Sequence, residues 1–151
     1  MDGSRVAAIR FFSDLPETEV AAIAEVAFEI RMAPGEALAK AGGPGYALFV
    51  IEAGTADVVV AGTKVRSVGG GDVVGEIAVF ASPPDPLAPP ELAEGGPRTA
   101  SVVATSSMRV IAVYKRDIWA LEHHAPLAVQ RLRAKFDEHR AADEQREGPI
   151  R

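Results

Sequence analysis

The chain has 151 residues, of which 48% are hydrophobic and 25% charged, and its formal net charge at pH 7 is −5. This length and composition fit one globular domain with a true core. The acidic balance argues against a broad nucleic-acid surface, although a few residues can still bind a small anion. The absence of cysteine excludes disulfides, thiolate catalysis and thiolate metal sites. The chain has no apolar run of about 18 residues and no secretory pattern, so we expect a cytoplasmic protein without a membrane partner.

The N-terminal part is predicted to be helical. Val6, Ile9 and Phe12 recur at helical spacing, which indicates a short amphipathic helix. Residues 13–16 should end this helix and supply the N-cap of a second one over residues 17–27. We therefore expect N-terminal helices over residues 1–27.

A series of short strands follows, with glycine and proline turns between them. The regular spacing is typical of an all-β barrel or sandwich, here over residues 28–113. The strands are predicted at residues 28–32, 37–41, 47–53, 56–61, 64–68, 99–104 and 109–113.

Helical spacing returns near the C-terminus, where we expect helices over residues 115–147. Ile118, Trp119 and Leu121 form the apolar side of a helix over residues 115–121. A longer helix should begin at residue 126 and extend to about residue 146. Charges of both signs follow one another along this last helix, and we interpret them as a solvated face.

The stretch from residue 69 to residue 102 carries the chemistry. It opens with three glycines and an aspartate, and two valines then lead to Gly75 and Glu76. The pattern predicts a strand that ends at Gly75 and a short helical turn that begins there, whose free N–H groups favour an anion. Arg98 returns to the same place later in the chain. One ligand could then be shared, with its phosphate on Arg98 and its sugar hydroxyls on the carboxylate of Glu76.

These residues resemble a known family. Residues 75–78 (Gly-Glu-Ile-Ala) and 97–102 (Pro-Arg-Thr-Ala-Ser-Val) look like the phosphate-binding cassette of cyclic nucleotide-binding domains, such as those of cAMP receptor protein and the protein kinase A regulatory subunit. Residues 11–16, residues 34–36 and Gly54 match the family's first helix and its hairpin turns. The resemblance implies an antiparallel β-roll or jelly-roll barrel (a double-stranded β-helix) with N-terminal helices and a C-terminal lid helix. The cassette would span residues 73–102.

Each residue also has a plainer interpretation. In this interpretation Gly75 serves a tight bend, Glu76 is a solvated carboxylate and Arg98 forms a surface ion pair, but we favour the ligand role for all three. Thr99 fits a β-branched strand position, and a hydroxyl residue there occurs in adenine and in guanine binders of the family. The ligand site that we predict consists of Gly75, Glu76, Ile77, Ala78, Arg98 and Thr99, with Val65 and Val74 lining the base or sugar pocket or packing in the core.

Residues 81–96 depart from the family, which has only a few residues between these two motifs. Five of them are proline, and three acidic residues add negative charge. Such a run cannot form a full hydrogen-bond ladder, so we predict an irregular surface loop with polyproline character. A lid over the pocket or a loop that binds a partner is the alternative.

We therefore predict a stand-alone sensor of cyclic AMP, with cyclic GMP as the other possible ligand, that has no cofactor and no enzymatic activity. The C-terminal helix would close on the bound base, and the output would need a protein partner or a homodimer. The alternative is a degenerate domain that keeps the fold as an interaction or dimerisation module without nucleotide. A metal-dependent enzyme is third, because the three histidines (His123, His124 and His139) all lie in the helical C-terminal part.

Overall fold

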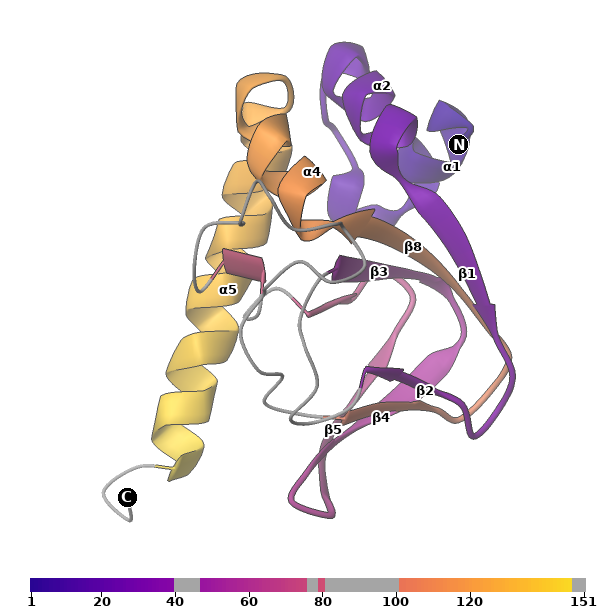
Figure 1. The fold of residues 1–151 in the computed structure, drawn as a ribbon, viewed down its shortest axis with the longest axis vertical. Coiled ribbons are helices and arrows are strands. Elements are labelled where there is room, and N and C mark those ends of the chain that lie inside the picture. The colour runs from indigo at the N-terminus through magenta and orange to yellow at the C-terminus, as the bar shows by residue number, and fades with distance from the viewer. Residues whose placement is uncertain (40–46, 76–78, 81–100, 148–151) are drawn as a thin grey trace.

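A computed structural model of the chain describes residues 1–39, 47–75, 79–80 and 101–147 (Figure 1). Its strands form two antiparallel four-stranded sheets, with the orders β1-β8-β3-β6 and β2-β7-β4-β5. The predicted fold class, an antiparallel β-roll with flanking helices, is confirmed, but the two sheets do not close into a barrel. The strands are β1 (Phe28–Met32), β2 (Ala37–Ala39), β3 (Ala47–Ala53), β4 (Thr55–Val60), β5 (Thr63–Gly69), β6 (Val73–Val74), β7 (Ser101–Ala104) and β8 (Met108–Tyr114).

The helices lie at both ends of the chain and cover one side of the sheet that contains β3 and β8 (Figure 1). The expected first helix is divided in two, because Ile9 adopts an extended conformation (φ −74°, ψ 126°). The helical elements are α1 (Gly3–Ala8), η1 (Arg10–Phe12), α2 (Glu17–Val26), α4 (Lys115–Ala120), η3 (Leu121–His123) and α5 (Pro126–Glu147).

The N-cap predicted for the second helix is wrong in its chemistry. Pro16 occupies the N-cap position of α2, and no side chain caps the helix. Asp14, which could have served, instead adopts a left-handed conformation with φ 64°. The turn geometry therefore takes precedence over side-chain capping, and Glu17 and Glu19 in the first turn favour the helix start through the helix dipole.

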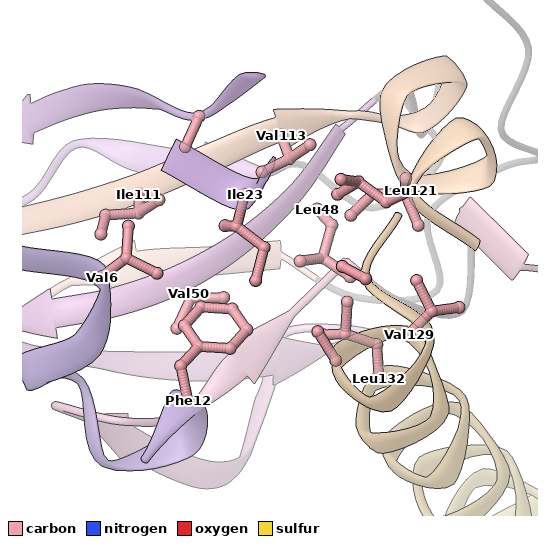
Figure 2. Packing of buried hydrophobic residues seen from close by; sticks show 14 of the residues in the cluster. Val6, Phe12, Ile23, Leu48, Val50, Ile111, Val113, Leu121, Val129 and Leu132 are labelled. Carbon is pink, nitrogen blue, oxygen red and sulfur yellow. The ribbon is translucent and has the colours of Figure 1, made fainter. Parts of the chain in front are cut away.

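Strands β3 and β8 are buried on both faces, which explains why each is a nearly continuous apolar run. Leu48, Val50, Ile111 and Val113 point toward the helices and pack with apolar residues of α1, η1, α2, η3 and α5 (Figure 2). We call this group the helix-side core. Its labelled members in Figure 2 are Val6, Phe12, Ile23, Leu48, Val50, Ile111, Val113, Leu121, Val129 and Leu132.

The alternate residues of the same strands face the inside of the roll. We call this second group the roll core, and it joins the two sheets. Its buried members are Met32, Ala47, Phe49, Ile51, Ala56, Val58, Val68, Val74, Val102, Ala104, Met108, Val110 and Ala112. Because both sheets contribute to one cluster, their inner faces pack against each other to form the roll.

Several sequence predictions fall outside the described residues. These are the last two residues of the expected strand 37–41, the breaker segment 42–45, the proline-rich residues 81–96 and the first two residues of the strand predicted at 99–104.

Candidate functional site

The strand that was expected to end at Gly75 does so in the structure. β6 pairs with β3 through Phe49–Val74 and Val50–Val73, and Gly75 follows with φ 88°. The N–H of Val79 then donates to the carbonyl of Gly75 at 3.3 Å, which is the hydrogen bond of one helical turn. A residue with a side chain is disfavoured at this φ, so glycine is required for the backbone to leave the strand and enter the turn.

The approach to this turn is held firmly by Asp72. Its carboxylate accepts a hydrogen bond from the N–H of Gly69 at 2.7 Å, and its own N–H donates to the Gly69 carbonyl at 3.0 Å. The backbone of Ile51 is bonded on both sides, to the carbonyl of Asp72 at 2.9 Å and to the N–H of Gly71 at 2.7 Å. The three-glycine segment is therefore a braced turn against β3, which positions β6 and the start of the turn at Gly75.

Apolar residues of the predicted site belong to the inside of the roll. Val74 is 3% exposed and is a member of the roll core, and Val65 packs against that core while remaining partly exposed. Val102, which ends the second sequence motif, is buried in the same cluster. Val74, just before Gly75, and Val102, at the end of the second motif, thus share one buried cluster, although they are 28 positions apart in the sequence. Core packing, the plainer interpretation, accounts for the two valines as they stand.

The remaining predicted ligand residues are Glu76, Ile77, Ala78, Arg98 and Thr99, and they lie outside the described residues. Of the predicted site, the structure therefore brings together the glycine turn and the apolar wall of the roll. The charged groups of the site stay sequence predictions.

The end of the helical turn contacts the C-terminal helices. The indole N–H of Trp119 in α4 donates to the carbonyl of Val79 at 3.0 Å. The rings of Phe80 and of Phe136 in α5 have centroids 6.0 Å apart with a 59° interplanar angle, a favourable tilted arrangement. Val79 and Phe80 are themselves buried in the helix-side core. A shift of Val79 and Phe80 would therefore act directly on the packing of α4 and α5.

The start of α5 is anchored to the N-terminal helices by a buried carboxylate. Glu19 of α2 is 5% exposed, and its two oxygens accept hydrogen bonds from the N–H groups of Ala128 at 2.9 Å and Leu127 at 3.3 Å. Pro126 is the first residue of α5 and has no N–H to satisfy. Glu19 therefore acts as an N-cap supplied from another helix.

A second contact ties α5 back to the N-terminal segment. Arg131 donates from Nη1 to the carbonyls of Ser13 at 2.6 Å and Phe11 at 3.1 Å, at the end of η1. Together with the cap from Glu19, these hydrogen bonds from Arg131 hold the first two turns of α5 in place, and the helix runs alongside the roll from there (Figure 1).

Charged residues on the helix side of the sheet form an ion cluster around Arg5. Its guanidinium donates to Glu52 at 2.6 and 3.1 Å and to Glu29 at 3.0 Å. The hydrogen bond from Arg5 lowers the pKa of Glu52 despite its burial. For Glu29, burial works to raise the pKa, but the hydrogen bond from Arg5 and the charges of Arg31 and Arg5 outweigh it, so that its pKa is lowered too. The cluster joins α1 to β1 and β3.

Within the described part of the chain, no group of three or more histidine or acidic residues is placed to hold a metal ion. His123 and His124 are exposed at the junction of η3 and α5. Of the helices described here, none has both the length and the apolar character that a membrane crossing needs.

Sequence reasoning missed the contacts of Glu19, Trp119 and Arg133. Glu19 was one of several acids in a helix, and its partners lie 108 and 109 residues away. The indole N–H of a partly buried tryptophan needs an acceptor, which was a usable indication, but nothing local identified Val79. Arg133 lies one helical turn before Phe136 on the same face of α5, and that spacing was the available clue.

Comparison with known proteins fits this architecture. A family model described as cyclic nucleotide-binding domain matches residues 29–124. The cAMP-dependent protein kinase regulatory subunit of Hypocrea atroviridis is 29% identical over 107 residues, which are 71% of this chain and 20% of that protein. The chain therefore spans about a fifth of the length of this curated relative.

Solved structures share the fold at low sequence identity. The catabolite activator protein of Thermus thermophilus has a TM-score of 0.71 at 22% identity, over 91% of this chain and 61% of that one. The regulatory subunit of a cAMP-independent protein kinase A from Trypanosoma brucei, in a mutant bound to cAMP in its A site, has a TM-score of 0.72 at 20% identity, over 92% and 49% of the two chains. At these identities the likeness shows the fold alone.

Proposed function

This chain belongs to the cyclic nucleotide-binding domain family, and on that premise we propose that it is a regulatory sensor of cyclic AMP. We propose further that residues 1–151 work as one domain, without a cofactor and without catalysis. The observation that carries the proposal is that β6 ends at Gly75 in a left-handed conformation, and that the N–H of Val79 donates back to the carbonyl of Gly75, which is α-helical spacing. Such a turn presents backbone N–H groups to an anion without a side chain in the way.

We assign the ligand contacts from this turn outward. The phosphate would be bound by the guanidinium of Arg98 and by the N–H groups of Ile77 and Ala78, and Thr99 could add a hydroxyl. The ribose hydroxyls would donate to Glu76. In the proposal the base or sugar would lie near Val65 and Val74, of which Val74 is buried in the roll core and Val65 packs against it.

The mechanism would be a shift between two conformations. Binding of the phosphate would tighten the turn after Gly75, and the contacts from Val79 and Phe80 to α4 and α5 would carry that change to the C-terminal helix, which would close on the base. A switch from 1:99 to 99:1 requires the nucleotide to prefer the closed form by about 5.5 kcal/mol. In this proposal the output passes to a partner protein or to a second copy of the chain.

The second candidate is a domain that keeps the fold as an interaction or dimerisation module without nucleotide. Two observations favour it. Residues 81–96 insert a long proline-rich segment between the two motifs, and one structurally similar protein is the regulatory subunit of a protein kinase A that is described as cAMP-independent.

Calorimetric titration with cyclic AMP and cyclic GMP separates these candidates. A sensor gives saturable heat with at least one nucleotide, and the tighter one identifies the messenger. The absence of heat and of any change in melting temperature with about 1 mM of either nucleotide would exclude the sensor, because binding weaker than that is worth less than about 4 kcal/mol.

A further inference from the structure

Arg133 in α5 lies against two aromatic rings that belong to two other elements. Its Cζ atom is 4.9 Å from the centroid of the Phe80 ring and 5.1 Å from the centroid of the Trp119 ring. Both distances are within the range of about 6 Å in which a guanidinium is attracted to the face of a ring. One helix side chain therefore contacts both the turn that follows Gly75 and α4.

The guanidinium is also fixed from a third direction. Its Nη2 atom is 3.1 Å from Oε1 of Glu122 in η3, and its side chain is 37% exposed. Phe136, one helical turn further along α5, packs its ring on Phe80. Arg133 and Phe136 thus hold Phe80 from α5, while the hydrogen bond from Trp119 holds the neighbouring carbonyl of Val79.

From these contacts we infer that Arg133 is a positioning residue that couples the turn after Gly75 to the orientation of α5. This inference rests on the proposed function, since the turn has to bind a nucleotide for the coupling to be used. Arg133 contacts Phe80, Trp119 and Glu122, none of which belongs to the predicted ligand site. It acts through Phe80 and Trp119, and its charge is balanced by Glu122 rather than offered to a phosphate.

The coupling follows from thermodynamic linkage. A nucleotide that tightens the turn also favours the arrangement in which Arg133 is stacked, so the loss of the stack must lower nucleotide affinity and the response of α5 together. A guanidinium stacked on a ring contributes from a few tenths of a pKd unit at exposed sites to more than one when desolvated. We therefore expect the dissociation constant for cyclic AMP to rise about 3- to 30-fold when the stack is removed.

The test compares Arg133→Met with Lys135→Met. Methionine keeps an apolar side chain of similar length, so the variant should fold. Lys135 is a matched control because it lies on the same helix, has the same 37% exposure and is paired within α5 to Glu138 at 3.4 Å. Both variants lose one positive charge, so a general effect on phosphate attraction is the same in the two.

The response of α5 can be read from the chain itself. Trp119 is the only tryptophan and the chain has no cysteine, so a fluorophore on Ala141→Cys, an exposed position of α5, reports its distance from Trp119 by energy transfer. Calorimetry on the same proteins measures affinity independently of that distance.

In the otherwise unchanged protein and in the Lys135→Met control, cyclic AMP should alter the transfer efficiency to the same extent. In Arg133→Met the dissociation constant for cyclic AMP should rise about 3- to 30-fold. At saturating cyclic AMP the change in energy-transfer efficiency should be less than about half of that in the unmutated chain. Arg133→Lys, which restores the cation, should recover part of both.

Equal affinity and equal transfer change in Arg133→Met and Lys135→Met would overturn the inference while leaving nucleotide binding intact. Binding without any transfer change in the unmutated chain would also overturn it. If the unmutated chain gives no heat with either nucleotide, the proposed function fails first and the inference falls with it.

Discussion

The buried carboxylate of Glu19 provides a strong test of how the helices are joined. In Glu19→Ala, the N–H groups of Leu127 and Ala128 at the start of α5 lose their acceptor. A hydrogen bond to a charged group contributes about 1.5–3 kcal/mol, and loss of an N-cap typically costs about 0.5–2 kcal/mol. These are two descriptions of one interaction, so we expect a loss of about 2–3 kcal/mol in the free energy of unfolding.

For a chain of this size each kcal/mol lowers the melting temperature by about 2–4 °C, so Glu19→Ala should melt about 4–12 °C lower. Far-UV circular dichroism during heating measures this. Glu19→Gln keeps one acceptor oxygen but loses the charge that favours a helix N-terminus. Its melting temperature should therefore lie between those of the unmutated chain and Glu19→Ala. Glu25→Ala, at an exposed position of the same helix, should change little. If Glu19→Ala has the same melting temperature as Glu25→Ala, the cap does not hold α5 to α2.

Three further outcomes follow from the same structure. Gly54→Ala should unfold more readily, because the φ of 100° at Gly54 disfavours a side chain and the new Cβ would clash with the carbonyl oxygen of Ser107. Urea denaturation should show that the free energy of unfolding falls by about 1–3 kcal/mol or more, since such a backbone conformation alone costs about that much. The pKa of Glu52 is lowered in the folded state by Arg5, so the stability from this pair is present above the ordinary glutamate pKa and is lost as pH falls through the folded value. The melting temperature should therefore fall less steeply with acidification in Arg5→Met than in the unmutated chain, and parallel curves would contradict the pairing. Cyclic AMP at 100 times its dissociation constant should stabilise the chain by about 2.7 kcal/mol, a rise of roughly 5–10 °C in melting temperature, and no rise would contradict a ligand that binds the folded state.

Local patterns predicted most of the strands and helices because the relevant physics is local. The apolar run of β3 and the glycine turn between β4 and β5 depend on periodicity and turn chemistry within a few residues. The strand end at Gly75 required only a glycine at that position. The break at Ile9 was missed because its spacing from Val6 and Phe12 fits a helix, and its side chain is buried in the helix-side core with theirs.

The contacts that join distant elements could not be predicted in the same way. Glu19 resembles any acid of a helix first turn, and only the folded chain brings the start of α5 to it. Arg133 belongs to a run of mixed charges that we interpreted as a solvated face, and its stacking depends on where Phe80 and Trp119 meet. For the ligand site, the roles of the charged residues are still predicted from the sequence alone. The structure adds the braced turn before Gly75 and the apolar wall of the roll.

The central claim is that an anion is shared by the turn at Gly75 and the guanidinium of Arg98. The most direct measurement is the dissociation constant for cyclic AMP in Arg98→Ala, compared with the unmutated chain and with Arg31→Ala, which removes a charge of 75% exposure from β1. A charge-assisted bond of about 1.5–3 kcal/mol predicts a roughly 10- to 150-fold weaker constant in Arg98→Ala alone. Equal constants in the three proteins would contradict the claim.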